Sequence, residues 1–134
     1  MKLSYRVNKP ADIVFHYLAD MQKFVSVHPV ITKMEIIKDN RYLVFETMKF
    51  GLIPFSFTYP VTVNSNIETK KISIKATVMK IALIEMMFSI APAYGHTIIH
   101  EEIKFKTVLP IKSLMQKIFI NQHQQLFLNI EKAI

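Results

Sequence analysis

Alternation of apolar and polar residues divides most of the chain into short extended segments. In residues 2–8, Leu3, Tyr5 and Val7 alternate with polar neighbours, which predicts a strand with one buried face. The same period of two residues predicts six further strands. Their ranges are 32–37, 41–46, 55–63, 71–78, 84–91 and 96–108.

Helical spacing of apolar residues appears after the first strand and again at the end of the chain. It predicts a short helix over residues 11–19, and Asp20 is expected to cap a second short helix that ends at His28-Pro29. Residues 111–134 contain neither Gly nor Pro and predict a helix of about 24 residues, roughly 36 Å long. Its apolar positions are Ile111, Met115, Ile118, Phe119, Leu126, Ile130 and Ala133.

Turn residues predict how neighbouring strands pair. Asp39-Asn40 is suited to a two-residue hairpin turn. The resulting pairing sets Met34 against Phe45 on the inner face and Lys33 against Glu46, opposite charges, on the outer face.

A second hairpin is predicted around Pro92–Gly95. If Ala91 pairs with His96, Met86 faces Glu101, and both side chains point inward.

The short links between the predicted strands favour an antiparallel meander. One face of this sheet is strongly apolar, and the long terminal helix is expected to cover it. We therefore predict an α+β fold in a single domain, residues 1–134. A seven-stranded curved antiparallel sheet would wrap round the C-terminal helix, with two short helices after the first strand.

The order of elements and the opening motif resemble the START and Bet v 1-like (SRPBCC) superfamily, which has the helix-grip fold. The motif is VNKPADIVF at residues 7–15, followed by Leu18-Ala19-Asp20, Phe24 and His28-Pro29. Bacterial members include polyketide cyclase/dehydrase-like proteins. The resemblance implies a cavity for lipids, polyketides or similar apolar molecules between the sheet and the last helix, and it does not by itself imply catalysis.

Large, soft side chains occupy the predicted inner face, where they would form either a packed core or the lining of such a cavity. Periodicity alone does not separate these alternatives. The residues that we expect to contact a ligand are Met34, Phe45, Phe55, Phe57, Tyr59, Met86, Phe88, Glu101, Phe105, Met115 and Phe119.

Glu101 is the candidate for chemistry, because the predicted register makes it the only inward carboxylate of the later strands. A buried carboxylate must be paired, hydrogen-bonded or neutralised. Glu101 could orient a ligand hydroxyl or act as a general base, or it could simply bond Tyr59 or Thr47. A register slip of one residue would turn it outward.

Other chemistry has little support in the sequence. There is no cysteine and no Gly-rich phosphate loop. His96 and His100 are about 13 Å apart on a strand, too far to share a metal. We assign His28 to a helix end and His16 and His123 to helix surfaces, and we expect no metal and no cofactor.

The formal charge of +7 weakly favours anionic partners. The 17 basic residues are scattered, so we expect no nucleic-acid binding. Lys71, Lys75, Lys104 and Lys106 point outward in the predicted register, which is either a solvated face or a transient contact with an anionic membrane.

We expect a cytoplasmic protein without an obligate protein partner. Residues 1–15 lack a signal-peptide core, and the most apolar run, residues 81–93, contains Glu85 and is shorter than the roughly 20 residues of a membrane span.

Three functions remain open from the sequence. The first is a binder or carrier of a small hydrophobic molecule. The second is a cyclase or dehydratase acting on a polyketide-like substrate, with Glu101 as its acid or base. The third is a protein-interaction module of the same fold, which would have a filled interior.

Overall fold

The computed structural model describes residues 1–133, except for the side chain of Phe50. The chain forms β1 (Lys2–Val7), α1 (Ala11–Ala19), α2 (Met21–Val27), β2 (Ile31–Lys38), β3 (Arg41–Phe50), β4 (Ile53–Asn66), β5 (Lys71–Val78), β6 (Ala82–Ala93), β7 (His96–Thr107) and α3 (Lys112–Lys132). The predicted α+β helix-grip architecture is confirmed. The predicted extension of the last helix to Ile134 lies outside the described residues.

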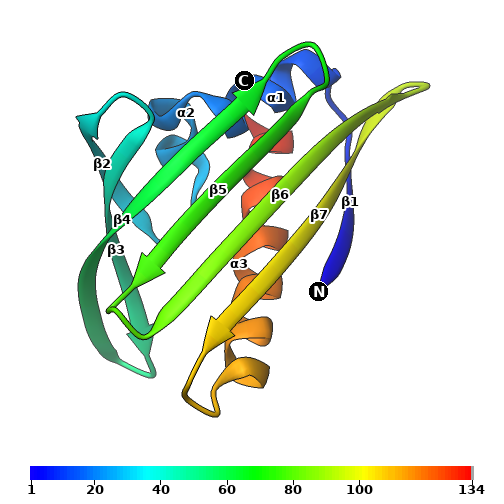
Figure 1. Ribbon diagram of the computed structural model, residues 1–134. Helices are drawn as coiled ribbons and strands as arrows, with labels where there is room; N and C mark the ends of the chain where they lie inside the picture. The colour runs from blue at the N-terminus through cyan, green and yellow to red at the C-terminus, as the bar shows by residue number, and fades with distance from the viewer. Residues whose placement is uncertain (134) are drawn as a thin grey trace.

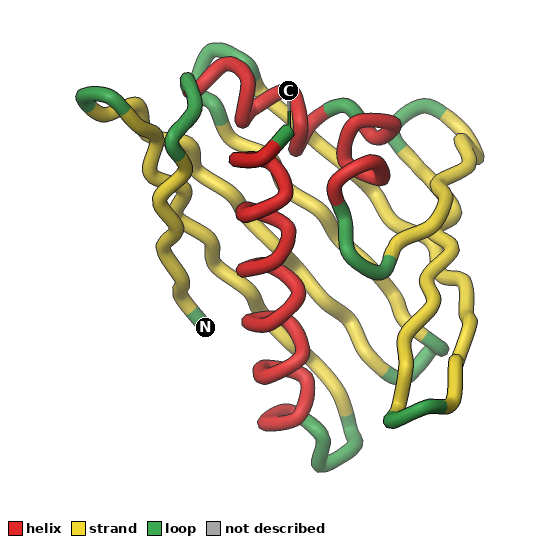
Figure 2. Tube along the Cα trace, turned by 180° about the vertical axis from the view of Figure 1, so that it is seen from behind, coloured by secondary structure: helices red, strands yellow, loops and turns green. Residues whose placement is uncertain are grey.

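All seven strands form one antiparallel sheet in the order β1-β7-β6-β5-β4-β3-β2. The sheet curves round α3, and α1 and α2 close one of its ends (Figures 1 and 2). None of the helices in residues 1–133 is long and apolar enough to cross a membrane.

The pairing of β2 with β3 differs from the prediction by one residue. Lys38 pairs with Arg41 across the predicted turn, but an irregularity between Ile36 and Lys38 shifts the rest of the ladder, so Met34 faces Val44. Because side chains alternate faces along a strand, this bulge exchanges inside for outside. Phe45 therefore lies on the outer face and Glu46 on the inner face, opposite to the prediction.

The β6–β7 hairpin differs from the prediction by two residues. Ala93 pairs with His96 across a tight Tyr94-Gly95 turn, so Glu101 faces Phe88 instead of Met86. A shift of two residues leaves every side chain on its predicted face. Glu101 accordingly points inward and is 2% exposed.

The two halves of α3 differ in their packing. Its buried side chains are His123, Leu126, Phe127 and Ile130, all in the C-terminal half. That half is also tied down by hydrogen bonds, because Asn129 donates to the Val27 carbonyl at 2.8 Å. In the N-terminal half, Met115 and Phe119 are only half-buried.

Asp20 caps α2, as predicted, by accepting hydrogen bonds from the backbone N–H groups of Gln22 and Lys23 at 3.0 and 3.3 Å. Asp20→Ala should lower the free energy of unfolding by about 1 kcal/mol in urea titrations, because two N–H groups lose their acceptor. Asp20→Asn keeps an acceptor and should retain most of this stability. Equal losses in the two variants would contradict the capping role.

Candidate functional site

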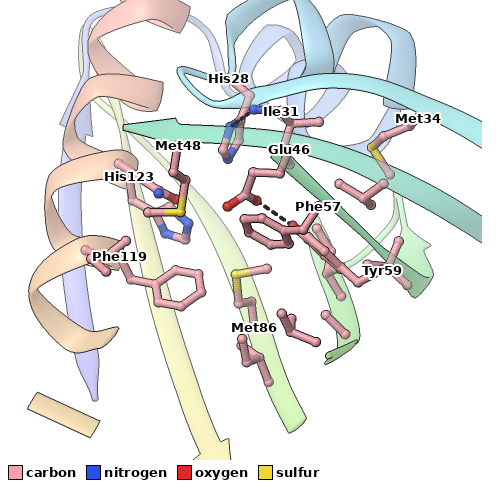
Figure 3. A pocket seen from close by; sticks show the side chains of 18 of the residues that line it. His28, Ile31, Met34, Glu46, Met48, Phe57, Tyr59, Met86, Phe119 and His123 are labelled. Atoms are coloured by element: carbon pink, nitrogen blue, oxygen red, sulfur yellow. Dashed lines mark hydrogen bonds between the residues drawn. The ribbon is translucent and has the colours of Figure 1, made fainter. Parts of the chain in front are cut away.

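A partly open cavity of about 130 Å³ lies between the concave face of the sheet and α3 (Figure 3). Strands β2 to β6 supply most of its wall, and α2, with His28 at its end, and residues 115–123 of α3 supply the rest. The lining residues are Phe24, His28, Ile31, Met34, Val44, Glu46, Met48, Phe57, Tyr59, Val61, Ile74, Ala76, Val78, Ile84, Met86, Met115, Ile118, Phe119, Gln122 and His123.

Six of the predicted ligand contacts line this cavity: Met34, Phe57, Tyr59, Met86, Met115 and Phe119. They alternate on the inner face of their strands or recur on one face of α3, as the periodicity predicts. Their large and flexible side chains leave a space that is apolar over most of its surface.

Five predicted contacts lie elsewhere. Phe45 is on the outer face, with the Lys33 ammonium 5.2 Å from its ring centroid. Phe55 is 41% exposed near the end of its strand. Phe88 is buried in the core, and Phe105 packs behind the cavity with its ring centroid 5.3 Å from that of Phe119.

Glu101, the fifth, is buried behind the cavity wall and pairs with His123. The His123 Nδ1 donates to Glu101 Oε1 at 2.7 Å, and Oε2 lies 2.6 Å from the same nitrogen but receives no hydrogen bond of its own. The interpretation of His123 as a surface residue is therefore wrong, since its side chain is 2% exposed. The alternative bonds of Glu101 to Tyr59 or Thr47 do not form.

The orientation of His123 follows from this contact. A carboxylate oxygen can only accept, so Nδ1 carries a proton and the second ring nitrogen, Nε2, is directed away from Glu101. The ring lines the cavity, and no hydrogen bond among the described residues engages Nε2. A bound molecule could therefore reach that nitrogen.

Glu46 is the second carboxylate of the site and accepts a hydrogen bond from the Tyr59 hydroxyl at 2.7 Å (Figure 3). Burial raises the pKa of Glu46, while the Tyr59 hydrogen bond and the charge of His123 act in the opposite direction. Burial and the charge of Glu46 raise the pKa of Tyr59, which keeps its hydroxyl protonated as a donor.

His28 completes the polar group at this end of the cavity. It ends α2, as predicted, and its Nδ1 accepts hydrogen bonds from the backbone N–H groups of Val30 and Ile31 at 3.2 and 3.1 Å. Burial, helped by the charge of His123, lowers the pKa of His28 to about 3. The ring is therefore neutral at neutral pH, with its proton on Nε2.

Tyr5 lies on the other side of Glu101, outside the cavity. Its hydroxyl is buried and has no hydrogen-bond partner among residues 1–133. Burial and the charge of Glu101 raise the pKa of Tyr5. Its ring packs on Phe127 at a centroid distance of 4.5 Å, so its role here is in the core.

The cavity thus has two chemically different ends. The polar cluster, which we define as His28, Glu46, Tyr59 and His123, lies toward α2. Apolar residues line the other end, which is formed by the start of α3 and the neighbouring strand ends. These residues are Val78, Ile84 and Met115, whereas Met48 lies beside His28 and His123 (Figure 3).

Sequence reasoning missed three of the four polar residues, for different reasons. The sequence pattern does not indicate Glu46, because only the bulge in β2 places its side chain on the inner face of the sheet. His123 did leave a signal, because it fills the gap between Phe119 and Leu126 in the apolar stripe of α3. His28 was placed correctly at a helix end, but its position in the cavity depends on the approach of α3.

Comparison with known proteins supports the architecture. No family model matches the chain, and no curated protein matches its sequence. Solved structures do match. A START superfamily protein from Mycobacterium smegmatis superposes with a TM-score of 0.80 at 15% identity, covering 98% of this chain and 93% of that one. The fold of this chain is therefore that of the START and Bet v 1-like proteins.

Two other matches extend this comparison. Ara h 8.0201 superposes with a TM-score of 0.78 at 16% identity, over 98% of this chain and 93% of that one. The di-domain aromatase/cyclase BexL from the BE-7585A biosynthetic pathway gives a TM-score of 0.79 at 13% identity, over 98% of this chain and 44% of that one. At these identities the likeness establishes the fold alone.

The lowered pKa of His28 predicts how the stability of the folded protein depends on pH. Its folded pKa, about 3, is below its ordinary value of 6.5. The stability due to the neutral ring is therefore complete above about pH 6.5 and is lost as the pH falls toward 3, because the unfolded chain takes up the proton first. His28→Asn keeps an acceptor for the two N–H groups but does not titrate.

We therefore expect wild-type protein to lose more stability than His28→Asn between about pH 7 and pH 4.5, by on the order of 2 kcal/mol in urea unfolding. His16→Asn, on the exposed face of α1, is the matched control and should behave as wild type. Parallel pH profiles for wild type and His28→Asn would contradict this account.

Proposed function

We propose that the protein binds a small, mostly apolar molecule that carries one neutral polar group. The observation that carries this proposal is the two-ended cavity, in which an apolar lining leads to the polar cluster. Burial of apolar surface, at about 25 cal/mol per Å², would supply most of the binding energy, and the polar cluster would orient the guest.

The size of the cavity limits the buried part of the guest. A volume of about 130 Å³ is close to the roughly 150 Å³ of an engineered apolar cavity that admits benzene. One ring or a short chain therefore fits inside the cavity, and a longer molecule would extend past the start of α3. The protein-interaction alternative predicts a completely filled interior, whereas the residues at this site enclose a cavity.

The polar cluster favours a hydroxyl over a carboxylate. A hydroxyl can donate to Glu46 and accept from the Nε2–H of neutral His28. A guest carboxylate would lie near two buried carboxyl groups, Glu46 and Glu101, and would lose its hydration in an apolar space. The cluster therefore selects an uncharged hydroxyl or a similar donor–acceptor group.

Native mass spectrometry of the purified protein, with analysis of its organic extract, tests constitutive carriage, and a stoichiometric apolar adduct is expected. Calorimetric titration then tests selectivity with phenol, toluene and benzoate as probes. We expect phenol to bind more tightly than toluene and benzoate not to bind.

Met115→Trp would fill the apolar end of the cavity and should weaken phenol binding by about tenfold or more. Leu114→Trp is its neighbour on the exposed side of α3 and should bind as wild type. An empty protein whose probe affinities do not depend on Met115 would overturn the proposal.

A second candidate function, proton transfer on a polyketide-like substrate, is favoured by the His123–Glu101 pair. In its neutral form, with the proton on Nδ1 held by Glu101, His123 has a lone pair on Nε2, and its ring lines the cavity. That nitrogen can accept a proton from carbon next to a carbonyl group and return it, which is general base and then general acid catalysis. Glu101 would act as a positioning residue rather than as the base.

Deuterium exchange at the carbons beside the carbonyl of cyclohexanone, followed by NMR, measures this step. If His123 is the base, His123→Gln should abolish the accelerated exchange, and Glu101→Gln should slow it by about 100-fold. Both variants should still bind cyclohexanone, which separates loss of proton transfer from loss of the cavity. An exchange rate unchanged in both variants would exclude this mechanism.

A further inference from the structure

The three connections β3–β4, β5–β6 and β7–α3 lie together at one end of the molecule, because antiparallel strands bring alternate connections to the same edge. Figures 1 and 2 both show them at the bottom of the view. We define the basic end as these connections with their flanking residues, 47–55, 78–83 and 105–117. The polar turns β2–β3 and β4–β5 lie at the opposite end.

The basic end has a composition unlike the rest of the chain. Its three segments contain five lysines, Lys49, Lys80, Lys106, Lys112 and Lys117, and no acidic residue. All five are exposed, and none forms an ion pair among the described residues. The turns at the opposite end, residues 38–41 and 66–71, mix four basic residues with two acidic ones, Asp39 and Glu68.

Large apolar side chains are exposed between these lysines. Leu52 and Val108 are 97% and 91% exposed, and each lies at the tip of its connection. Others with exposed side chains at the basic end are Ile53, Met79, Ile81 and Leu114. Exposed apolar residues grouped on one surface indicate an interaction site.

The β5–β6 turn adds an independent observation. Met79 and Lys80 have φ angles of 54° and 58°, and the Ile81 N–H donates to the Val78 carbonyl at 3.1 Å, as in a type I′ turn. Such turns favour Asn-Gly, because other residues are strained at positive φ. An apolar residue and a lysine therefore occupy the tip at a conformational cost, which indicates a role outside the folded core.

We propose that the basic end docks on an anionic lipid bilayer surface. The apolar tips would enter the interfacial region, and the surrounding lysines would contact lipid phosphates with their stems along the acyl boundary. Charge complementarity favours an anionic bilayer, because each lysine near the surface raises the affinity about fivefold.

The composition fits a bilayer better than a protein or a nucleic acid. Stable protein interfaces are enriched in Tyr, Trp and Arg and depleted in Lys, whereas the basic end has no Tyr, Trp or Arg. A nucleic acid would leave the apolar tips facing phosphates. Separate aliphatic tips interleaved with lysines suit a lipid bilayer, which has an apolar interior and an anionic surface.

The docking surface also borders the cavity. Met48, Val78 and Met115 line the cavity, and each is next in sequence to a residue of the exposed surface, Lys49, Met79 and Leu114. A molecule passing between the bilayer and the cavity would need to cross only the basic end. Docking itself requires no guest, so it stands apart from the proposed function.

Co-sedimentation with vesicles tests the proposal, using phosphatidylcholine alone and an equal mixture of phosphatidylcholine and phosphatidylglycerol. We expect wild-type protein to bind the mixed vesicles, to bind the neutral ones weakly, and to be released as salt screens the charges. Failure to bind the mixed vesicles would overturn the proposal, whatever the cavity holds.

Two paired variants separate the basic end from the overall positive charge. Lys80→Glu with Lys112→Glu should weaken binding by about 25-fold or more, at about fivefold per lysine. Lys38→Glu with Lys71→Glu makes the same change of net charge away from the basic end and should bind as wild type. If both double variants lose vesicle binding equally, binding depends on net charge alone, and the proposal is overturned.

The apolar tips are tested in the same way. Leu52→Ser with Val108→Ser should weaken binding by about tenfold or more. Ile36→Ser with Ile67→Ser, also exposed but remote from the basic end, should not. Analytical ultracentrifugation of wild type and of the Leu52→Ser, Val108→Ser variant tests whether a second copy of the chain binds this surface instead. A dimer that the first pair dissociates would assign the surface to a second copy of the chain and overturn membrane docking.

Discussion

The hydrogen bond between His123 and Glu101 joins the long helix to the sheet, and the arrangement of the site depends on it. Both side chains are almost fully buried, so the helix cannot move off the sheet without leaving a buried carboxylate unpaired. The contact lies at the boundary between packed core and cavity. Toward the C-terminus from it, α3 packs closely, with Leu126, Phe127 and Ile130 in the core. Toward the N-terminus, α3 lies over the cavity.

A single helix cannot fill the concave face of a seven-stranded sheet, and the chain meets this geometric limit unequally at its two ends. The short helices α1 and α2 supply additional apolar side chains to the core at one end. No further helix covers the other end among residues 1–133, so the space there is bounded by flexible methionine and aromatic side chains. The same asymmetry concentrates exposed aliphatic residues and lysines at the three connections beside that space.

Polar groups inside the protein are arranged so that each one restrains another. Burial and the charge of His123 lower the pKa of His28 and keep it neutral, and its Nδ1 accepts hydrogen bonds from two backbone N–H groups. Glu46 is held by Tyr59, and the charge of His123 offsets part of the cost of burying it. These groups have hydrogen-bonding capacity directed into the cavity that the protein itself does not use. An apolar interior with such a cluster is suited to orienting a guest as well as enclosing it.

The periodicity of apolar residues determined the number, type and order of the elements, because each element must bury one face. It also placed Glu101 inside, since the two-residue error in the β6–β7 register preserved the face. Periodicity could not predict the bulge near Ile37, which depends on how β2 fits the curved sheet and which puts Glu46 inside instead of Phe45. Nor could it show that His123 meets Glu101, because the approach of a helix to a sheet is set by packing between residues distant in sequence. The sequence thus determined the fold and an apolar interior, and only the tertiary structure decided which polar groups meet within it.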